Sequence, residues 1–297
     1  MPLDFPLFSV VIPTYNRAHL IGETIKSVLA VTFSNFEILV IDDGGKDNTQ
    51  EVVSKFTDDR VHYYKKENAE RGAARNYGRI RAKGMYVNFF DSDDLMYPNH
   101  LAVAKQMIDE VHDPEFFHLG YDFKNPQGEV TKKVNQFDET IRSKILFDNL
   151  LSCNGVFVRR DIAALFPFEE NRMLASAEDW ELWIRLAASY TLHYSNEITT
   201  SVVNHDQRSI RTIPSEKLIA RDMLLVQILR NNPSIRKMYG KDFKTFIAER
   251  YTFIMLCLAE DRKPLEVAKW AGLAMSADPA IALTRRFLMS IKNCLRS

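Results

Sequence analysis

The chain of 297 residues contains 46% hydrophobic and 26% charged residues, a composition typical of a soluble protein whose length supports a sizeable core. Its 39 basic and 39 acidic residues balance, which excludes a global charge that would attract nucleic acid or an anionic membrane. The chain does not open on a secretion signal and has no apolar run as long as a membrane span, so we expect a cytoplasmic protein. The three cysteines are widely spaced, which predicts free thiols rather than a disulfide framework or a zinc site.

Four short apolar runs, rich in β-branched and aromatic residues, predict the strands of the first hundred residues. Asn16 follows the first run and is expected to cap the helix after it. The predicted strands are residues 8–13, 36–41, 61–64 and 86–90, and the predicted helices are residues 20–29, 48–56 and 73–82. Strands that alternate with helices indicate βαβ units and a mostly parallel sheet.

Polar residues follow three of these strands. They are Thr14 with Tyr15, Asp42 with Asp43, and residues 91–94. Because open parallel sheets bind ligands beyond the carboxyl ends of their strands, we expect these segments to meet at one edge and form a ligand site. The glycine fingerprint of a dinucleotide site and the phosphate loop of P-loop NTPases are both absent, which removes the usual support for those two classes.

The acidic segment Asp91-Ser92-Asp93-Asp94 predicts a site for a divalent metal and a diphosphate. Asp91 and Asp93 can both turn toward one Mg²⁺ or Mn²⁺, a cation typically shared between one or two carboxylates and substrate phosphates. A merely solvated acidic turn is the alternative for so short a motif. An EF-hand calcium loop fits poorly, because Leu95 stands where a ligand is expected and Met96 where a glycine is needed.

The downstream part of the chain predicts further strands and then helices. Residues 113–138 predict a strand with a hairpin-like excursion, and residues 151–157 a segment that re-enters the sheet beside the acidic turn. A last strand is expected at residues 192–194, before a polar loop at residues 201–209. From about Pro214 onward the pattern is helical.

Five segments, in this order and spacing, resemble the inverting glycosyltransferases of family 2, which have the GT-A fold. The resemblance covers about residues 7–206. It implies an α/β fold, a Rossmann-like and mostly parallel sheet flanked by helices, with an α-helical C-terminal extension. The expected division is a catalytic domain at residues 1–212 and a helical region at residues 213–297, with a nucleotide-sugar half at 1–98 and an acceptor half at 99–212. The matching segments are residues 9–17, 36–49, 72–78, 86–98 and 178–185.

The resemblance implies a nucleoside diphosphate-sugar donor. Tyr15 would stack on the nucleobase, and Asp43 would accept the imide N–H of uracil or thymine, which favours a UDP-sugar. The structural alternatives are a strand-end aromatic for Tyr15, a helix-capping acid for Asp43 and a surface ion pair for Arg75. The implied nucleotide-sugar residues are Pro13, Thr14, Tyr15, Arg17, Asp43, Arg75, Ser92 and Asp91, and the implied metal ligands are Asp93, Asp91 and Asp94.

The same resemblance places a catalytic base at Asp179. Inverting transfer needs a group that takes the proton from the acceptor hydroxyl, and a carboxylate suits this task. Asp179 begins a predicted helix, whose N-terminus favours the ionised form of an acid. Glu178 is the second candidate, with orientation of Asp179 or binding of a sugar hydroxyl as its other roles. A first-turn acid that serves only the helix dipole is the structural alternative.

Two further residues are weaker candidates. Asn154 is expected either to contact the acceptor or to be a turn residue. His205 stands where some resembling enzymes carry a histidine near the metal or the diphosphate, with Arg208 and Arg211 as phosphate contacts, although a surface role is common for a single histidine.

The segment after Asp278 carries basic residues among apolar ones and no acids. It predicts an amphipathic helix on an anionic membrane surface, or else an ordinary helix packed on the domain or on a partner. A peripheral position at the inner face of the plasma membrane would suit a lipid-linked acceptor.

The expected activity is therefore metal-dependent, inverting transfer of a sugar to a saccharide or lipid-linked saccharide in cell-surface polysaccharide synthesis, with Mn²⁺ or Mg²⁺ as cofactor. One alternative is a sugar-phosphate nucleotidyltransferase, but its Gly-rich N-terminal loop is missing. Another is a non-catalytic nucleotide-sugar-binding subunit, which the intact Asp93 and Asp179 disfavour. The motifs do not encode the sugar, the linkage or the oligomeric state.

Overall fold

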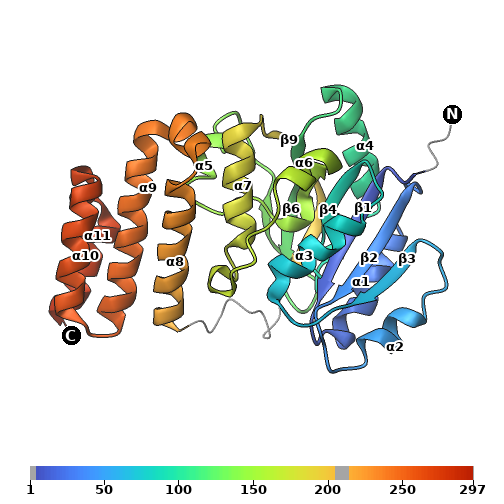
Figure 1. Ribbon diagram of the computed structural model, residues 1–297, viewed down its shortest axis with the longest axis horizontal. Coiled ribbons are helices and arrows are strands. Elements are labelled where there is room, and N and C mark those ends of the chain that lie inside the picture. The colour runs from blue at the N-terminus through green and yellow to red at the C-terminus, as the bar shows by residue number, and fades with distance from the viewer. Residues whose placement is uncertain (1–4, 205–213, 297) are drawn as a thin grey trace. The chain divides into compact units, whose positions relative to one another are not determined.

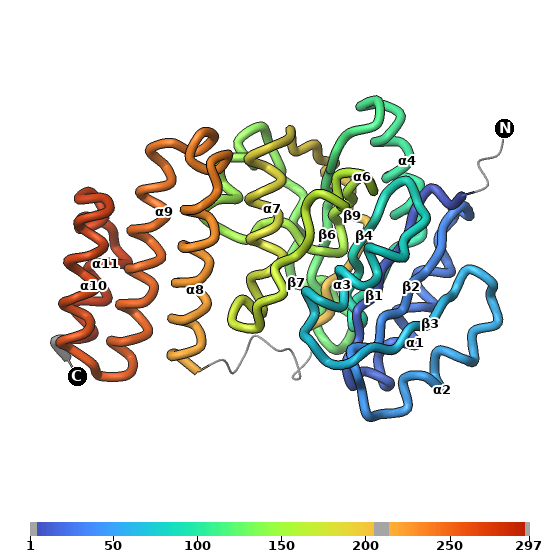
Figure 2. Tube along the Cα trace, viewed as in Figure 1, coloured from blue at the N-terminus to red at the C-terminus, as the bar shows by residue number. Residues whose placement is uncertain are grey.

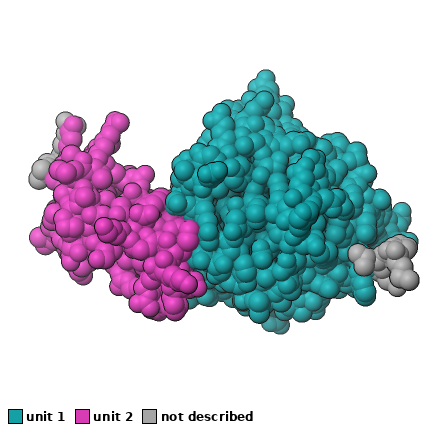
Figure 3. Space-filling model, turned by 90° about the horizontal axis from the view of Figure 1, so that it is seen from above, with its two compact units in different colours: residues 1–145, 149–172, 178–208 teal, residues 146–148, 173–177, 209–297 magenta. Residues whose placement is uncertain are grey.

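The computed structural model describes residues 5–204 and 214–296. By its contacts the chain forms two compact units, coloured separately in Figure 3. The first comprises residues 1–145, 149–172 and 178–208, and the second residues 146–148, 173–177 and 209–297.

The first unit is built on one mixed sheet. Within the described residues its strands are β1 (Phe8–Thr14), β2 (Phe36–Asp42), β3 (Val61–Lys65), β4 (Tyr86–Phe89), β5 (Leu95–Met96), β6 (Phe116–Lys124), β7 (Val130–Val134), β8 (Val156–Arg159) and β9 (His193–Val203). They lie in the order β3-β2-β1-β4-β8-β6-β9-β5, with β7 paired to β6. The strands from β3 to β4 are all parallel, as predicted, and β5, β7 and β8 pair antiparallel with their neighbours.

Helices cover both faces of the sheet (Figure 1). They are α1 (Ala18–Leu29), α2 (Thr49–Ser54), α3 (Glu70–Arg81), α4 (His100–Val111), α5 (Ile141–Lys144), α6 (Arg160–Leu165) and α7 (Glu178–Ser189). Apolar residues of α1 and α4 share one buried cluster with alternate residues of β1 and β2, such as Val10 and Ile38. On the other face, α3 approaches the sheet so closely that a Cβ on Gly78 would lie 2.3 Å from Val11 Cγ1.

Local chemistry explains how β1 ends and α1 begins. Pro13 has no N–H to donate to a neighbouring strand. The pairing of β1 with β4 ends at Val11, so the proline lies beyond the hydrogen-bond ladder between these two strands. The predicted cap on α1 is wrong. Asn16 has φ 52° and accepts a hydrogen bond from Lys46 N at 2.8 Å, whereas Ala18 N donates to Asp47 Oδ2 at 2.8 Å. The cap therefore comes from the loop after β2.

The C-terminal half of the sheet largely follows the prediction. β6 and β7 form the expected hairpin, and β8 re-enters the sheet antiparallel to β4. β9 is longer than predicted and runs to Val203, through the first residues of the expected polar loop. Thr200 and Ser201 are fully buried in it, because pairing with β6 and β5 satisfies their backbone groups.

The second unit is mainly helical, as predicted. It contains α8 (Ser215–Arg230), α9 (Pro233–Glu260), α10 (Pro264–Ala277) and α11 (Arg285–Arg296). Figure 2 shows α9, α10 and α11 side by side, with Met255, Leu258 and Ala274 in their shared apolar cluster. Within the described residues, none of the helices combines the length and the apolar content that crossing a bilayer requires.

Candidate active site

The predicted meeting of three strand ends is confirmed. Asp43 N, just after β2, donates to Thr14 O at the end of β1 at 2.8 Å, and Phe90 N, just after β4, donates to Val11 O at 2.9 Å. The acidic turn of residues 91–94 therefore leaves the sheet beside the ends of β1 and β2.

Asp94 and Asn154 fix the shape of this turn. Asp94 is 1% exposed, and its two carboxylate oxygens accept hydrogen bonds from Val203 N at 2.8 Å and from Asn154 Nδ2 at 2.7 Å. Asn154 is fully buried, and its Oδ1 accepts from Asp91 N at 2.9 Å. In this structure both side chains are turned into the protein and hold the turn, which for Asn154 agrees with the turn residue considered as its alternative. A metal-ligand role for Asp94 stays a prediction.

Asp91 and Asp93 keep access to solvent. Their side chains are 30% and 15% exposed, and each faces a cation: Arg75 Nη2 lies 2.8 Å from Asp91 Oδ1, and Arg17 Nη2 lies 3.7 Å from Asp93 Oδ2. Ser92 between them is buried. No group of three or more metal-binding side chains occurs in the part of the chain that the structure describes. Two carboxylates nevertheless fit a hard cation whose other ligands are water and diphosphate oxygens.

Arg75 of α3 connects this turn to α7. It is 1% exposed, and its guanidinium donates to Asp91 Oδ1 at 2.8 Å and to Glu178 Oε1 at 2.7 Å. The surface ion pair considered from the sequence is therefore wrong. Since Arg75 bonds to both acids, the acidic turn and the start of α7 belong to one site.

Asp179, next to Glu178, is held at the edge of this network. Trp180 N donates to its Oδ1 at 2.7 Å, and Asn149 Nδ2 donates to its Oδ2 at 3.3 Å. Burial, and after it the neighbouring Glu178, raises the pKa of the Asp179 carboxyl above its ordinary value, against the opposing effect of Arg75. The expected lowering by the helix N-terminus is therefore outweighed. A raised pKa brings the carboxylate closer to the basicity that general-base catalysis near neutral pH favours.

The predicted nucleotide end of the site has one exposed aromatic and one buried acid. Tyr15 is 47% exposed, so its ring is open to a stacking partner. Asp43 is buried, and its Oδ1 accepts from Lys66 Nζ at 2.7 Å and from Ala69 N at 3.0 Å. Its Oδ2 accepts from Asn68 Nδ2 at 3.1 Å, which leaves that oxygen capacity for one more donor. Pro13 and Thr14 are buried, so their side chains support the edge.

Two neighbours of Asp179 were missed by the sequence reasoning, namely Asn149 and Cys153. Each is a single residue in a segment without a motif, so only the fold brings them to the carboxylate. His205, Arg208 and Arg211 lie outside the described residues.

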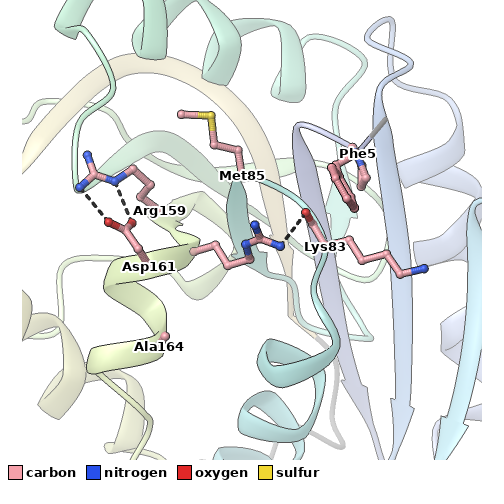
Figure 4. A pocket seen from close by; sticks show the side chains of 8 residues that line it. Phe5, Lys83, Met85, Arg159, Asp161 and Ala164 are labelled. Carbon is pink, nitrogen blue, oxygen red and sulfur yellow. Dashed lines mark hydrogen bonds and ion pairs between the residues drawn. The ribbon is translucent and has the colours of Figure 1, made fainter. Parts of the chain in front are cut away.

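A hollow of about 560 Å³ lies elsewhere on the first unit. Phe5, Met85 and Ala164 are among its lining residues, and Arg159 pairs there with Asp161 at 2.8 Å (Figure 4). These residues flank the amino ends of β1 and β4, whereas the acidic turn lies at their carboxyl ends. The hollow is therefore separate from the candidate active site.

The fold and the site define the class of GT-A glycosyltransferases, in which a parallel half-sheet with an acidic turn joins a half that carries a further carboxylate. The structure matches that of S. aureus TarS in complex with UDP-GlcNAc, with a TM-score of 0.73, 21% identity, and coverage of 97% of this chain and 89% of that one. It also matches the Pyrobaculum calidifontis mannosyltransferase PcManGT, solved with GDP-Man and Mn²⁺, with a TM-score of 0.59, 19% identity, and coverage of 99% and 85%. At these identities the matches show the fold.

Sequence comparison shows the family. The model of Glycosyl transferase family 2 matches residues 9–163. The chain is 32% identical over 185 residues to the E. coli UDP-Glc:alpha-D-GlcNAc-diphosphoundecaprenol beta-1,3-glucosyltransferase WfgD, covering 62% of this chain and 71% of that protein. It is 35% identical over 188 residues to an uncharacterised glycosyltransferase of Rickettsia conorii, covering 62% of this chain but 30% of that protein. The chain spans about a third of the length of this relative and of those in Rickettsia felis and Rickettsia bellii. It belongs to glycosyl transferase family 2.

Proposed function

We propose that the protein transfers a sugar, with inversion, from a UDP-sugar to a saccharide or lipid-linked saccharide during cell-surface polysaccharide synthesis. The observation that carries this proposal is the bridge made by Arg75, which bonds to Asp91 on the donor side and to Glu178 beside Asp179. One site thus offers carboxylates that can bind the metal ion on a diphosphate, and a separate carboxylate that can accept a proton.

The residues divide the work of an in-line displacement. Asp179 would accept the proton of the acceptor hydroxyl. At the same time the hydroxyl oxygen would bond to the anomeric carbon of the donor sugar, and the bond from that carbon to the diphosphate would break. Mg²⁺ or Mn²⁺, held by Asp93 and Asp91, would neutralise charge on the leaving diphosphate. Arg75 would keep Glu178 and Asp91 charge-compensated without entering the reaction.

Donor choice is proposed from the nucleotide end of the site. The remaining acceptor capacity of Asp43 Oδ2 suits the imide N–H of uracil, and the ring of Tyr15 is open for stacking. TarS in complex with UDP-GlcNAc and WfgD, named for UDP-Glc, support the same nucleotide. The match of the Glycosyl transferase family 2 model to residues 9–163 also supports glycosyl transfer over nucleotidyl transfer.

A panel of UDP-, GDP- and dTDP-sugars with Mn²⁺ tests this proposal. We expect a UDP-sugar to raise the unfolding midpoint by on the order of 5 °C at about 100 times its Kd, because a ligand that binds only the folded state stabilises it by mass action. Asp93→Asn should remove the Mn²⁺-dependent part of the rise, whereas Asp161→Asn, at the opposite edge of the sheet, should keep it. The absence of a rise with any donor would reject the proposed activity. Donor binding without transfer to any acceptor or hydrolysis would favour the non-catalytic subunit.

We also propose contact with the inner face of the plasma membrane through α11. Part of its apolar stripe packs inside the helical unit, since Phe287 is buried. Leu288 and Met289 remain 56% and 45% exposed, beside exposed cations and without an acid in the helix. This surface suits anionic lipid headgroups, and a lipid-linked acceptor, as in the name of WfgD, would be presented there.

Vesicle flotation checks this membrane surface. We expect binding to phosphatidylglycerol-containing vesicles that weakens with salt, and little binding to neutral phosphatidylcholine vesicles. Replacing Arg285, Arg286 and Lys292 by Glu should weaken binding by about 100-fold, at roughly 1 kcal/mol for each cation. The matched control replaces exposed Lys55, Lys132 and Lys133 by Glu. Equal weakening by both triple variants, or no vesicle binding at all, would contradict the assignment.

A further inference from the structure

Oδ2 of Asp179 faces two side chains from the segment that precedes β8. Asn149 Nδ2 lies 3.3 Å from this oxygen and Cys153 Sγ lies 3.9 Å from it, within the range for a bond with sulfur. Oδ1 accepts from Trp180 N on its own helix. Both oxygens of the carboxylate are therefore held, one by α7 and one by the segment that precedes β8.

The position of Cys153 is itself fixed by the acidic turn. Cys153 is 3% exposed and begins a 3-10 helix with Asn154, whose side chain bonds to Asp91 N and to Asp94. Burial, supported by the nearby Asp179 and opposed by Arg75, raises the pKa of the Cys153 thiol well above its ordinary value. The thiol is therefore protonated at neutral pH and can act as the donor in its contact with the carboxylate.

We propose that Cys153 and Asn149 are positioning residues that fix the rotation of the Asp179 carboxylate and so aim its accepting lone pair at the acceptor hydroxyl. This inference rests on the proposed function, in which Asp179 is the base. The charged groups around Asp179 are Glu178, Arg75, Asp91 and Arg71. Arg75 donates to Glu178 and Asp91, and Arg71 pairs with Glu178 at 3.8 Å, whereas the hydrogen bonds to the Asp179 carboxylate come from Trp180 N, Asn149 and Cys153.

The first experiment measures sugar transfer from the UDP-sugar by Cys153→Ala, Cys153→Ser and Asn149→Ala. It gives kcat, the KM of the donor and the pH profile of kcat/KM for each variant. We expect kcat to fall roughly tenfold in the alanine variants, about the loss of one hydrogen bond to a charged group, with the KM of the donor unchanged. Loss of a donor to the carboxylate raises its pKa, so the acid limb of kcat/KM should move to higher pH. Cys153→Ser keeps a donor and should restore most of the rate.

The matched control is Cys257→Ala, which removes a buried thiol from α9 in the other unit. We expect it to leave kcat and the pH profile as in the unmodified protein. Asn149 is exposed, so Asn149→Ala tests the proposal even if a change at buried Cys153 impairs folding. Alanine variants with unchanged kcat and an unmoved acid limb would overturn the proposal, as would a fall of the same size in Cys257→Ala.

A second experiment does not require activity. Urea unfolding of Cys153→Ala, Asp179→Ala and the double variant forms a thermodynamic cycle, in which side chains in contact show non-additive effects. We expect the two changes to be coupled by at least about threefold in the unfolding equilibrium constant. Additive effects would overturn the contact. Coupling in a protein that transfers no sugar would instead retain the contact and reject the proposed function, so the two failures are distinguishable.

Discussion

Asp179→Asn is expected to lower kcat by about 10²- to 10⁴-fold, the usual contribution of a positioned general base. Asparagine keeps the size of the side chain and its bond with Trp180 N, but it cannot accept the proton of the acceptor. Donor affinity should be retained, because the proposed nucleotide-binding residues are others. Initial rates with saturating donor, together with donor titration, separate the two quantities. A variant with normal kcat would remove Asp179 from the mechanism.

The pH dependence of the unmodified protein provides a further check on the base. Since Asp179 must be ionised to accept a proton, kcat/KM should fall as the pH is lowered through its pKa. The pKa is raised by burial and by Glu178, so this acid limb should lie above the range of an ordinary aspartate. Asp161→Asn, which changes an acid at the opposite edge of the sheet, should leave the limb in place.

Arg75→Met is expected to destabilise the fold by about 3–5 kcal/mol, the usual cost of removing one partner from a buried ion pair. Methionine fills part of the space, but Glu178 and Asp91 then lose the guanidinium between them, and Glu178 is 3% exposed. Transfer activity should also be lost, because the two acids no longer hold their relative positions. Urea unfolding measures the first effect and initial rates the second.

Arg60→Met is the matched control for this substitution. Arg60 pairs with Asp58 at 2.7 Å, but both side chains are 32% exposed, and such pairs contribute about 0–1 kcal/mol. A loss at Arg75 no larger than that at Arg60 would contradict the view that the buried guanidinium connects the two sides of the site.

The sequence predicted the features that depend on local pattern. Apolar runs located β1 to β4 to within a residue or two, and polar residues after three of them located the edge of the site. Partners distant in sequence could not be predicted in this way. Asp94 and Asp93 are adjacent acids in one motif, yet Val203 N and Asn154 turn Asp94 inward while Asp93 stays accessible. The capping of α1 by Asp47 and the raised pKa of Asp179 likewise depend on tertiary neighbours.

Sequence periodicity also failed to predict polar residues that are buried in a strand. Ser201 was predicted to begin a loop, but paired strands on both sides make it part of β9. The contact of Cys153 with Asp179 could not be predicted, because a lone cysteine in a short apolar segment has the pattern of an ordinary core residue.

The arrangement of the site has a consequence for engineering a different nucleotide preference. Tyr15 and Asp43 follow β1 and β2, whereas Asp179 lies in the first turn of α7, and Arg75 connects the acidic turn beside the strand ends to that helix. Mutant libraries confined to the loops after β1 and β2 should therefore alter nucleotide preference while leaving proton transfer intact. Libraries that include position 75 should instead be dominated by inactive, poorly folded clones.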